Sequence, residues 1–142
     1  MRKNRPAFTT VVTASWSVRL PAQYARIGIS RGAPRGQSGY RSYRPLAPGP
    51  WFRSVPSAEF CNRYLSQLGA LDPDRVMRDL SALADGRMAA LLCFEQPPPD
   101  PAWCHRSLVS AWLADTLDLQ VVEYGYEESG WGHRHPKLPD GW

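Results

Sequence analysis

Hydrophobic positions along the chain follow two repeats, one typical of strands and one typical of helices. Residues 10–16 (TVVTASW) and 24–30 (YARIGIS) are rich in β-branched and aromatic side chains, and both are expected to be strands. Residues 88–94 (MAALLCF) form a continuous apolar run, which is typical of a strand covered on both faces in a parallel sheet. Residues 119–124 (LQVVEY) predict a last strand.

In three other segments apolar residues recur every three or four positions, as on one face of a helix. These segments are residues 57–68, 73–85 and 101–117. Ser57 and Asp72 are the expected N-caps of the first two helices, and Gly69 and Gly86 are expected to end them. The pair Asp100–Pro101 repeats the start signal and is expected to begin the third helix.

The order of these elements predicts the fold class. Strand, helix and strand over residues 88–124 make one βαβ unit, which implies a parallel pair of strands. We expect a single small α/β domain over residues 1–142, with a mostly parallel sheet of about four strands and packed helices. Residues 31–52 are expected to be a long loop rich in Gly, Pro and Arg. Residues 1–9 are expected to be loose, and residues 125–142 to be a covering or loose tail.

The charge of the chain is unevenly distributed along it. The net charge is +4, but ten basic residues and no acidic residue precede Glu59. Either the two halves pair their charges across one fold, or the basic half serves an anion site. Within residues 31–44, Arg31 and Arg35 are the favoured anion-binding residues, because arginine binds phosphate and carboxylate through two parallel hydrogen bonds. The sequence does not assign Arg41 and Arg44 to the anion site or to another role.

The three cysteines, Cys61, Cys93 and Cys104, do not form the pattern of a secreted disulfide framework. We therefore expect unpaired thiols in a reducing compartment. No apolar run approaches the ~20 residues that a membrane helix needs, and the N-terminal apolar run is too short and too broken by threonine for a secretion signal. The protein is accordingly predicted to be cytoplasmic, without a membrane partner.

Five polar residues gather around one predicted strand end and one predicted helix start. Cys93 and Glu95 end the strand, and Cys104, His105 and Arg106 lie near the start of the following helix. In an open α/β sheet, sites form beyond the carboxyl ends of the strands, where helix N-termini attract anions. The helix start and Arg106 would favour a thiolate at Cys104, and His105 could carry a proton. Cys93 is a secondary candidate, expected to be a buried wall of the site.

Structural alternatives accompany this prediction. Arg106 would either bind an anionic ligand or pair with Glu95 or Asp115. The motif His133-Arg134-His135, together with the cysteines, offers ligands that suit zinc, which leaves a structural zinc domain as a further alternative. Their spacing matches no known zinc motif, so neither a metal site nor a cofactor is predicted.

Four stretches together resemble the family called domain of unknown function 488. They are RIGISRGAPRG, YRPLAPGPWF, ALLCFE and WCHRSLVSAWLADTL, and the likeness runs roughly from Val11 to Pro139. Its most specific part is Cys93 and Glu95 followed by Cys-His-Arg at 104–106. The resemblance implies a compact α/β domain whose polar motif residues form an active site, with no established activity. Many relatives have an Asp-Val-Arg strand end that is absent here, and Arg31 would take its place.

Two functions follow from these features. The first is a cytoplasmic enzyme acting on a phosphate-bearing or otherwise anionic small molecule. Its residues would be Cys104 as nucleophile or redox thiol, His105 as acid or base, Glu95 orienting His105, and Arg31, Arg35 and Arg106 binding the anion. The second is a nucleic-acid or nucleotide binding module without chemistry, because Tyr40, Tyr43 and Trp51 interleave with the arginines as in surfaces that stack bases.

Overall fold

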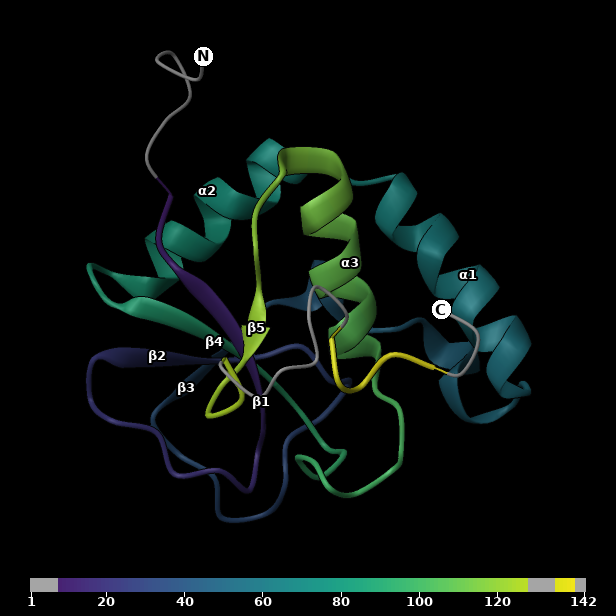
Figure 1. The fold of residues 1–142 in the computed structure, drawn as a ribbon, viewed down its shortest axis with the longest axis horizontal. Helices are drawn as coiled ribbons and strands as arrows, with labels where there is room; N and C mark the ends of the chain where they lie inside the picture. The colour runs from purple at the N-terminus through teal and green to yellow at the C-terminus, as the bar shows by residue number, and fades with distance from the viewer. Residues whose placement is uncertain (1–7, 128–134, 140–142) are drawn as a thin grey trace.

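A five-stranded parallel sheet forms the centre of the molecule (Figure 1). The computed structural model describes residues 8–127 and 135–139. The strands are β1 (Val11–Ser15), β2 (Tyr24–Gly28), β3 (Tyr40–Ser42), β4 (Met88–Cys93) and β5 (Val122–Glu123). Their order across the sheet is β3-β2-β4-β1-β5, and each neighbouring pair is parallel. The predicted α/β class and parallel sheet are confirmed.

The sheet has five strands rather than about four, because β3 lies inside the segment that was predicted to be loop. β3 is the edge strand of the sheet and pairs with β2, from Tyr40 opposite Arg26 to Ser42 opposite Gly28. The strand has only three residues, and two of them are exposed, so it lacks the apolar run that marked the other strands. Two short 3₁₀ turns, η1 (Arg44–Leu46) and η2 (Pro50–Arg53), also lie in this segment.

Three α-helices connect the strands: α1 (Ser57–Gly69), α2 (Pro73–Ala84) and α3 (His105–Leu117). The predicted cap of α2 is confirmed, since the Asp72 side chain accepts a hydrogen bond from the Asp74 N–H at 3.1 Å. The predicted cap of α1 is wrong, because Pro56 occupies the N-cap position and Ser57 is already helical. Among the described residues, no helix is long and apolar enough to cross a membrane.

The start of α3 also differs from the prediction. Asp100 accepts a hydrogen bond from the Ala102 N–H at 2.9 Å and forms a local turn instead of a helix cap. The helix begins at His105, with Cys104 at its N-cap position. The Cys104 N–H donates to the carbonyl oxygen of Lys137 at 3.0 Å, so residues 135–139 help to fix where the helix begins.

Helices α2 and α3 pack on one face of the sheet, α1 packs beside α3, and the other face of the sheet is covered by connecting segments (Figure 1). The larger core joins Ile27 and Leu91 of the sheet to residues of α1, α2 and α3. The smaller core lies around Trp16, whose ring crosses β2. A Cβ at Gly28 would lie 2.7 Å from that ring, so glycine at this position allows the ring to cross. The sheet therefore has one helical face and one aromatic loop face.

The strand order creates a crevice between β2 and β4. The chain leaves β2 toward β3 on one side of the sheet, and it leaves β4 toward β5 on the other side. Neighbouring strands whose connections run in opposite directions leave an open space beyond their carboxyl ends. In this fold the two segments that border this space are residues 29–33 and residues 93–95.

Candidate functional site

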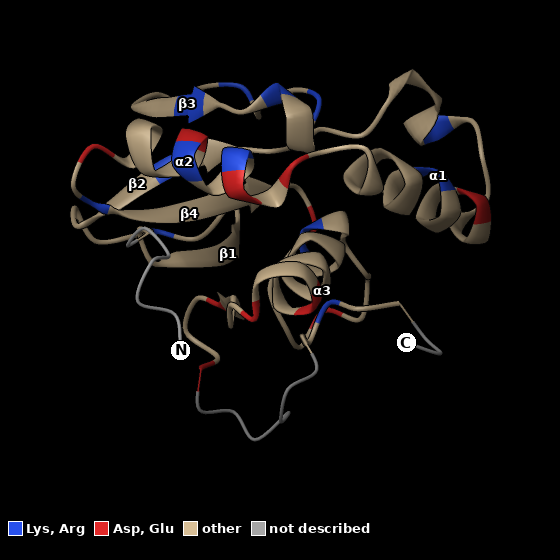
Figure 2. Cartoon of the chain, turned by 90° about the horizontal axis from the view of Figure 1, so that it is seen from above, with Lys and Arg blue, Asp and Glu red and all other residues tan. Residues whose placement is uncertain are grey.

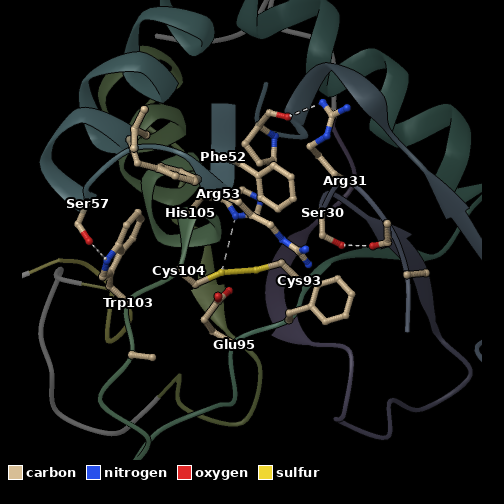
Figure 3. A pocket seen from close by; sticks show the side chains of 17 residues that line it. Ser30, Arg31, Phe52, Arg53, Ser57, Cys93, Glu95, Trp103, Cys104 and His105 are labelled. Atoms are coloured by element: carbon tan, nitrogen blue, oxygen red, sulfur yellow. Dashed lines mark hydrogen bonds between the residues drawn. A yellow bond between two sulfur atoms is a disulfide. The ribbon is translucent and has the colours of Figure 1, made fainter. Parts of the chain in front are cut away.

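A pocket of about 760 Å³ lies at this crevice (Figure 3). It is lined by residues 30–33 after β2, residues 93–95 at the end of β4 and residues 102–105 at the start of α3. The 48–60 segment lines it as well, through residues that include Phe52, Arg53, Ser57 and Phe60. Four of the predicted site residues line the pocket together with Cys93, and these four are Arg31, Glu95, Cys104 and His105.

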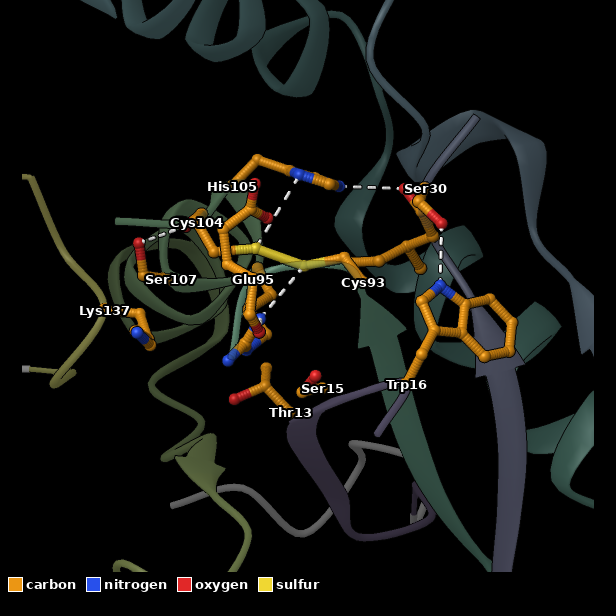
Figure 4. Close-up of a disulfide and its surroundings, with 12 residues drawn as sticks. Thr13, Ser15, Trp16, Ser30, Cys93, Glu95, Cys104, His105, Ser107 and Lys137 are labelled. Carbon is orange, nitrogen blue, oxygen red and sulfur yellow. Dashed lines mark hydrogen bonds between the residues drawn. A yellow bond between two sulfur atoms is a disulfide. The ribbon is translucent and has the colours of Figure 1, made fainter. Parts of the chain in front are cut away.

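Cys93 and Cys104 form a disulfide at the wall of the pocket (Figures 3 and 4). The expectation of unpaired thiols is therefore wrong for these two residues, and it holds for Cys61, which is buried and free. The two cysteines are 11 positions apart in the chain, but the end of β4 and the start of α3 meet at the same edge of the sheet. Both sulfur atoms are almost fully buried from solvent by their surroundings.

His105 completes a group that we call the thiol cluster, consisting of Cys93, Cys104 and His105. The His105 Nε2 lies 2.8 Å from the carbonyl oxygen of Ile29, and a carbonyl only accepts, so Nε2 carries the proton. The unprotonated Nδ1 then faces the Cys104 Sγ at 4.0 Å. Burial, opposed by the Ile29 hydrogen bond and assisted by the Arg106 charge, lowers the pKa of His105 to about 4.

The geometry bears on the predicted roles of Glu95 and His105. Ile29, not the predicted Glu95, orients the His105 ring, although the Glu95 side chain lines the same pocket. His105 is neutral near neutral pH, because its pKa lies well below that range, so its unprotonated Nδ1 can accept a hydrogen bond or a proton.

Arg106 points away from the pocket and into a second group, the ion-pair cluster of Thr13, Arg106, Glu123 and His135. Its Nε and Nη2 each donate to the Glu123 carboxylate at 2.9 Å, and both side chains are almost completely buried. Its Nη1 donates to the Glu95 carbonyl oxygen at 2.9 Å and contacts the Cys93 Sγ at 3.2 Å. The acidic partner of Arg106 is thus Glu123 of β5, whereas Asp115 is exposed on α3.

Thr13 and His135, the other members of the ion-pair cluster, also contact the Glu123 carboxylate. The Thr13 hydroxyl donates to the Glu123 Oε1 at 2.7 Å and lies 2.7 Å from the His135 Nε2. Burial alone would raise the pKa of Glu123, but hydrogen bonds from His135, Arg106 and Thr13 and the charge of Arg106 lower it to about 2. Of the predicted His133-Arg134-His135 ligands, only His135 falls within the described residues, and it belongs to this cluster.

Two arginines face the pocket from different segments. The guanidinium groups of Arg31 and Arg53 lie 5.8 Å and 5.3 Å from the centre of the Phe52 ring. Arg31 also donates to the Pro48 carbonyl oxygen at 3.2 Å, and neither arginine pairs with a carboxylate among the described residues. The predicted Arg35 is exposed and does not line the pocket.

A family model described as the active DUF488-N3 subclade matches residues 10–117. The chain belongs to the DUF488 family. The predicted resemblance is therefore confirmed. No curated protein and no solved structure matches the chain. The DUF488 match spans β1 to α3 and includes every residue that lines the pocket, whereas Glu123 and His135 lie beyond it.

Sequence reasoning missed Arg53, Phe52 and Glu123. Arg53 was one of ten basic residues before Glu59, and nothing in its neighbourhood separated it from the others. Phe52 belongs to the short turn η2 inside the segment predicted to be a loop. Glu123 lies near the end of the predicted strand LQVVEY. This position was the one signal that could have placed it at the same edge of the sheet as Cys93 and Glu95.

Proposed function

We propose that this protein is an enzyme that binds an anionic small molecule in the pocket and acts on it through a thiol. One observation carries the proposal: two arginines that have no carboxylate partner within residues 8–127 and 135–139 line the same pocket as the thiol cluster (Figure 3). A carboxylate partner would neutralise an arginine, whereas Arg31, which donates to the Pro48 carbonyl oxygen, and Arg53 keep their positive charge and further N–H donors for a ligand. The description of the family as an active subclade agrees with an enzyme and names no reaction.

Cys104 in its reduced form is the nucleophile in this proposal. It occupies the N-cap position of α3, where the unpaired N–H groups of the first turn stabilise a negative charge. Its proton passes to the His105 Nδ1, which faces the sulfur, while the sulfur electron pair attacks an electrophilic atom of the ligand. The leaving group then takes that proton back from His105, so the protons of this step balance.

The other pocket residues have supporting roles. Arg31 and Arg53 bind the negative charge of the ligand, and Phe52 between them holds both guanidinium groups in place. Glu95 is the only carboxylate that lines the pocket in the described part of the chain, so it is available to exchange a proton with the ligand. Arg106 acts indirectly, because it holds the Cys93 sulfur and the Glu95 main chain in position.

Alkylation of Cys104 tests this function. In the reduced Cys93→Ser variant, iodoacetamide should modify Cys104 faster than a thiol in an unfolded peptide, and inorganic phosphate should slow the reaction. The substitutions Arg31→Gln and Arg53→Gln should remove the protection by phosphate, whereas Arg35→Gln is the matched control and should keep it. Ordinary reactivity of Cys104 would contradict its role as nucleophile. Equal protection in all variants would contradict the anion site.

Nucleic-acid binding is a second candidate, supported by a different surface. Arg35, Arg41 and Arg44 are exposed on β3 and the connections beside it, and this part of the chain contains no acidic residue (Figure 2). Binding of single-stranded DNA or RNA by this surface should weaken steeply with salt and should fall in the Arg41→Gln variant. Absence of binding at low salt would exclude this candidate without affecting the pocket.

A further inference from the structure

We propose that the thiol cluster, when reduced, binds a zinc ion through the Sγ atoms of Cys93 and Cys104 and the Nδ1 of His105. The fourth coordination position would face the pocket. This inference goes beyond the proposed function and does not depend on it. Because the ion would use the same sulfur electron pair that attacks a ligand, the metal-bound form and the nucleophilic form exclude each other.

The positions of the three ligating atoms carry the proposal. One ligand atom from each of Cys93, Cys104 and His105 lies within 4.8 Å of the other two. In a tetrahedral zinc site with Zn–S of about 2.3 Å and Zn–N of about 2.0–2.1 Å, the ligand atoms are roughly 3.5–3.8 Å apart. The Cys104 Sγ and the His105 Nδ1 are 4.0 Å apart, so that edge needs only a small contraction.

The backbone spacing also suits two separated sulfur atoms. The Cα atoms of Cys93 and Cys104 are 7.6 Å apart. Most disulfides join Cα atoms about 4.4–6.8 Å apart, so β4 and α3 are already wide enough to hold a metal between the side chains. Reduction by an external dithiol, which is itself oxidised to a disulfide and supplies two electrons and two protons, would release both sulfurs as ligands without bringing the two elements closer.

The tautomer of His105 is fixed in the form that a metal ligand requires. Its Nε2–H donates to the carbonyl oxygen of Ile29, which leaves the Nδ1 lone pair directed at the Cys104 sulfur. Zinc-bound histidines commonly donate their other ring N–H to a backbone carbonyl in this way. The ring is held further by the edge-on Tyr64 ring, whose centre is 5.2 Å away. Little side-chain entropy would therefore be lost when a metal binds.

The charges around the cluster balance a divalent cation. Two thiolates neutralise Zn²⁺, and the Arg106 Nη1 at 3.2 Å would donate a hydrogen bond to the Cys93 sulfur. The positive charge of Arg106 is itself paired with Glu123, so the surroundings do not add a net repulsion. Two sulfurs and one imidazole nitrogen favour zinc over magnesium or calcium, which prefer oxygen ligands.

The pocket gives this metal site an open side. Three protein ligands with a free fourth position are the arrangement of catalytic zinc sites, whereas structural sites use four protein ligands. The free position would face the space between Arg31 and Arg53, where water or an anion from solution can enter. The disulfide and the metal-bound form are alternatives, since each requires both sulfurs.

Metal binding by the whole chain tests the inference without any activity assay. The protein is reduced under anaerobic conditions, freed of metal with a chelator and titrated with Co²⁺ and then Zn²⁺. We expect one ion per chain, with Co²⁺ giving an intense thiolate-to-cobalt charge-transfer band that Zn²⁺ removes. The substitutions Cys93→Ser, Cys104→Ser and His105→Ala should each weaken binding at least tenfold, and Cys61→Ser is the matched control that should not.

A footprint on the unmodified sequence keeps the test decisive if a variant does not fold. Zinc should protect Cys93 and Cys104 of the reduced protein from alkylation, as measured on the peptides by mass spectrometry, and the oxidised protein should bind no cobalt. Absence of the charge-transfer band in the reduced protein, or loss of it in Cys61→Ser, would overturn the inference. Failure of anion protection at Cys104 would overturn only the proposed function, because that measurement is made without metal.

Discussion

The thiol cluster and the ion-pair cluster lie on two sides of the first turn of α3, and they differ in how their polar groups are paired. In the ion-pair cluster, Arg106 and Glu123 satisfy each other through two hydrogen bonds, and neither side chain lines the pocket. In the thiol cluster, Cys93, Cys104 and His105 line a pocket that is also lined by two arginines with no carboxylate partner in the part of the chain that the structure describes. His105 and Arg106 are neighbours in the sequence, yet one lines the pocket and the other belongs to a closed ion pair.

Because of this difference, we expect substitutions in the ion-pair cluster to change mainly the stability of the fold, and substitutions of the pocket arginines to change mainly ligand binding. A buried charge whose partner is removed is costly, so the ion-pair cluster is expected to control whether the carboxyl edge of the sheet forms at all. Exposed arginines at a pocket cost little to remove, so they are expected to control what the pocket binds. Arg106 connects the two groups, because it pairs with Glu123 and also contacts the Cys93 sulfur.

The largest expected effect comes from breaking the ion pair. The substitution Glu123→Gln leaves the Arg106 charge buried without a counter-charge and should lower the free energy of unfolding by about 3–5 kcal/mol. Urea unfolding of the purified variant measures this. The control Glu59→Gln breaks the half-exposed pair with Arg63 and should change stability by less than about 1 kcal/mol. Equal losses in the two variants would mean that burial does not distinguish the pairs.

Acidification should remove the contribution of the ion-pair cluster in a defined pH window. The pKa of Glu123 is lowered from 4.5 to about 2, so its contribution is complete above pH 4.5 and is lost as the pH falls toward 2. This shift corresponds to about 3 kcal/mol. The difference in unfolding free energy between the wild type and Glu123→Gln should shrink by about this amount between pH 6 and pH 2. Parallel pH profiles would contradict the assignment of the shift to Glu123.

Reduction of the disulfide should have a smaller effect on stability. The bond closes a loop between residues 11 positions apart, which constrains the unfolded chain by about 3 kcal/mol or less. Unfolding with and without a thiol reductant measures this contribution. The double substitution Cys93→Ala and Cys104→Ala should make the protein insensitive to reductant. A remaining response in that variant would have to come from Cys61, which is free.

The substitution Arg53→Gln is expected to have the smallest effect on stability and a clear effect on phosphate binding. Arg53→Gln should change the free energy of unfolding by less than about 0.5 kcal/mol, because its side chain is exposed and has no carboxylate partner among the described residues. The same substitution should weaken phosphate binding roughly tenfold, measured by calorimetry, which corresponds to about 1.4 kcal/mol. If Arg35→Gln weakens binding as much as Arg53→Gln, the anion lies outside the pocket.

The sequence predicted β1, β2 and β4 and the three helices because each carries a long apolar repeat. It missed β3, since three residues with two exposed side chains give no such repeat. It began α3 too early, because Asp100–Pro101 resembles a helix start while Asp100 in fact holds a local turn. Start signals of this kind describe the local chain alone, and the start of α3 depends on a contact with Lys137, 33 positions beyond Cys104.

The candidate site was also predicted only in part, because element order can be derived from the sequence and long-range packing cannot. Cys93, Glu95, Cys104 and His105 meet because strand ends and helix starts share one edge of a parallel sheet, and this can be derived from the element order. Which acid pairs with Arg106 cannot be derived in that way. Glu95, Asp115 and Glu123 are all acidic and near in the chain, and only the packing of β5 beside β1 brings Glu123 to the guanidinium.

Three consecutive residues at the start of α3 contact three different strands or the segments that follow them. Cys104 meets the end of β4, His105 meets the residue after β2, and Arg106 meets β5. These contacts fix both the rotation of the helix about its axis and its position along that axis. Inserting a single residue within 104–106 would turn the side chains on one side of it by about 100° relative to those on the other. Such a chain would keep all three residue types and still lose both clusters, so the spacing of this tripeptide is as much a part of the site as its chemistry.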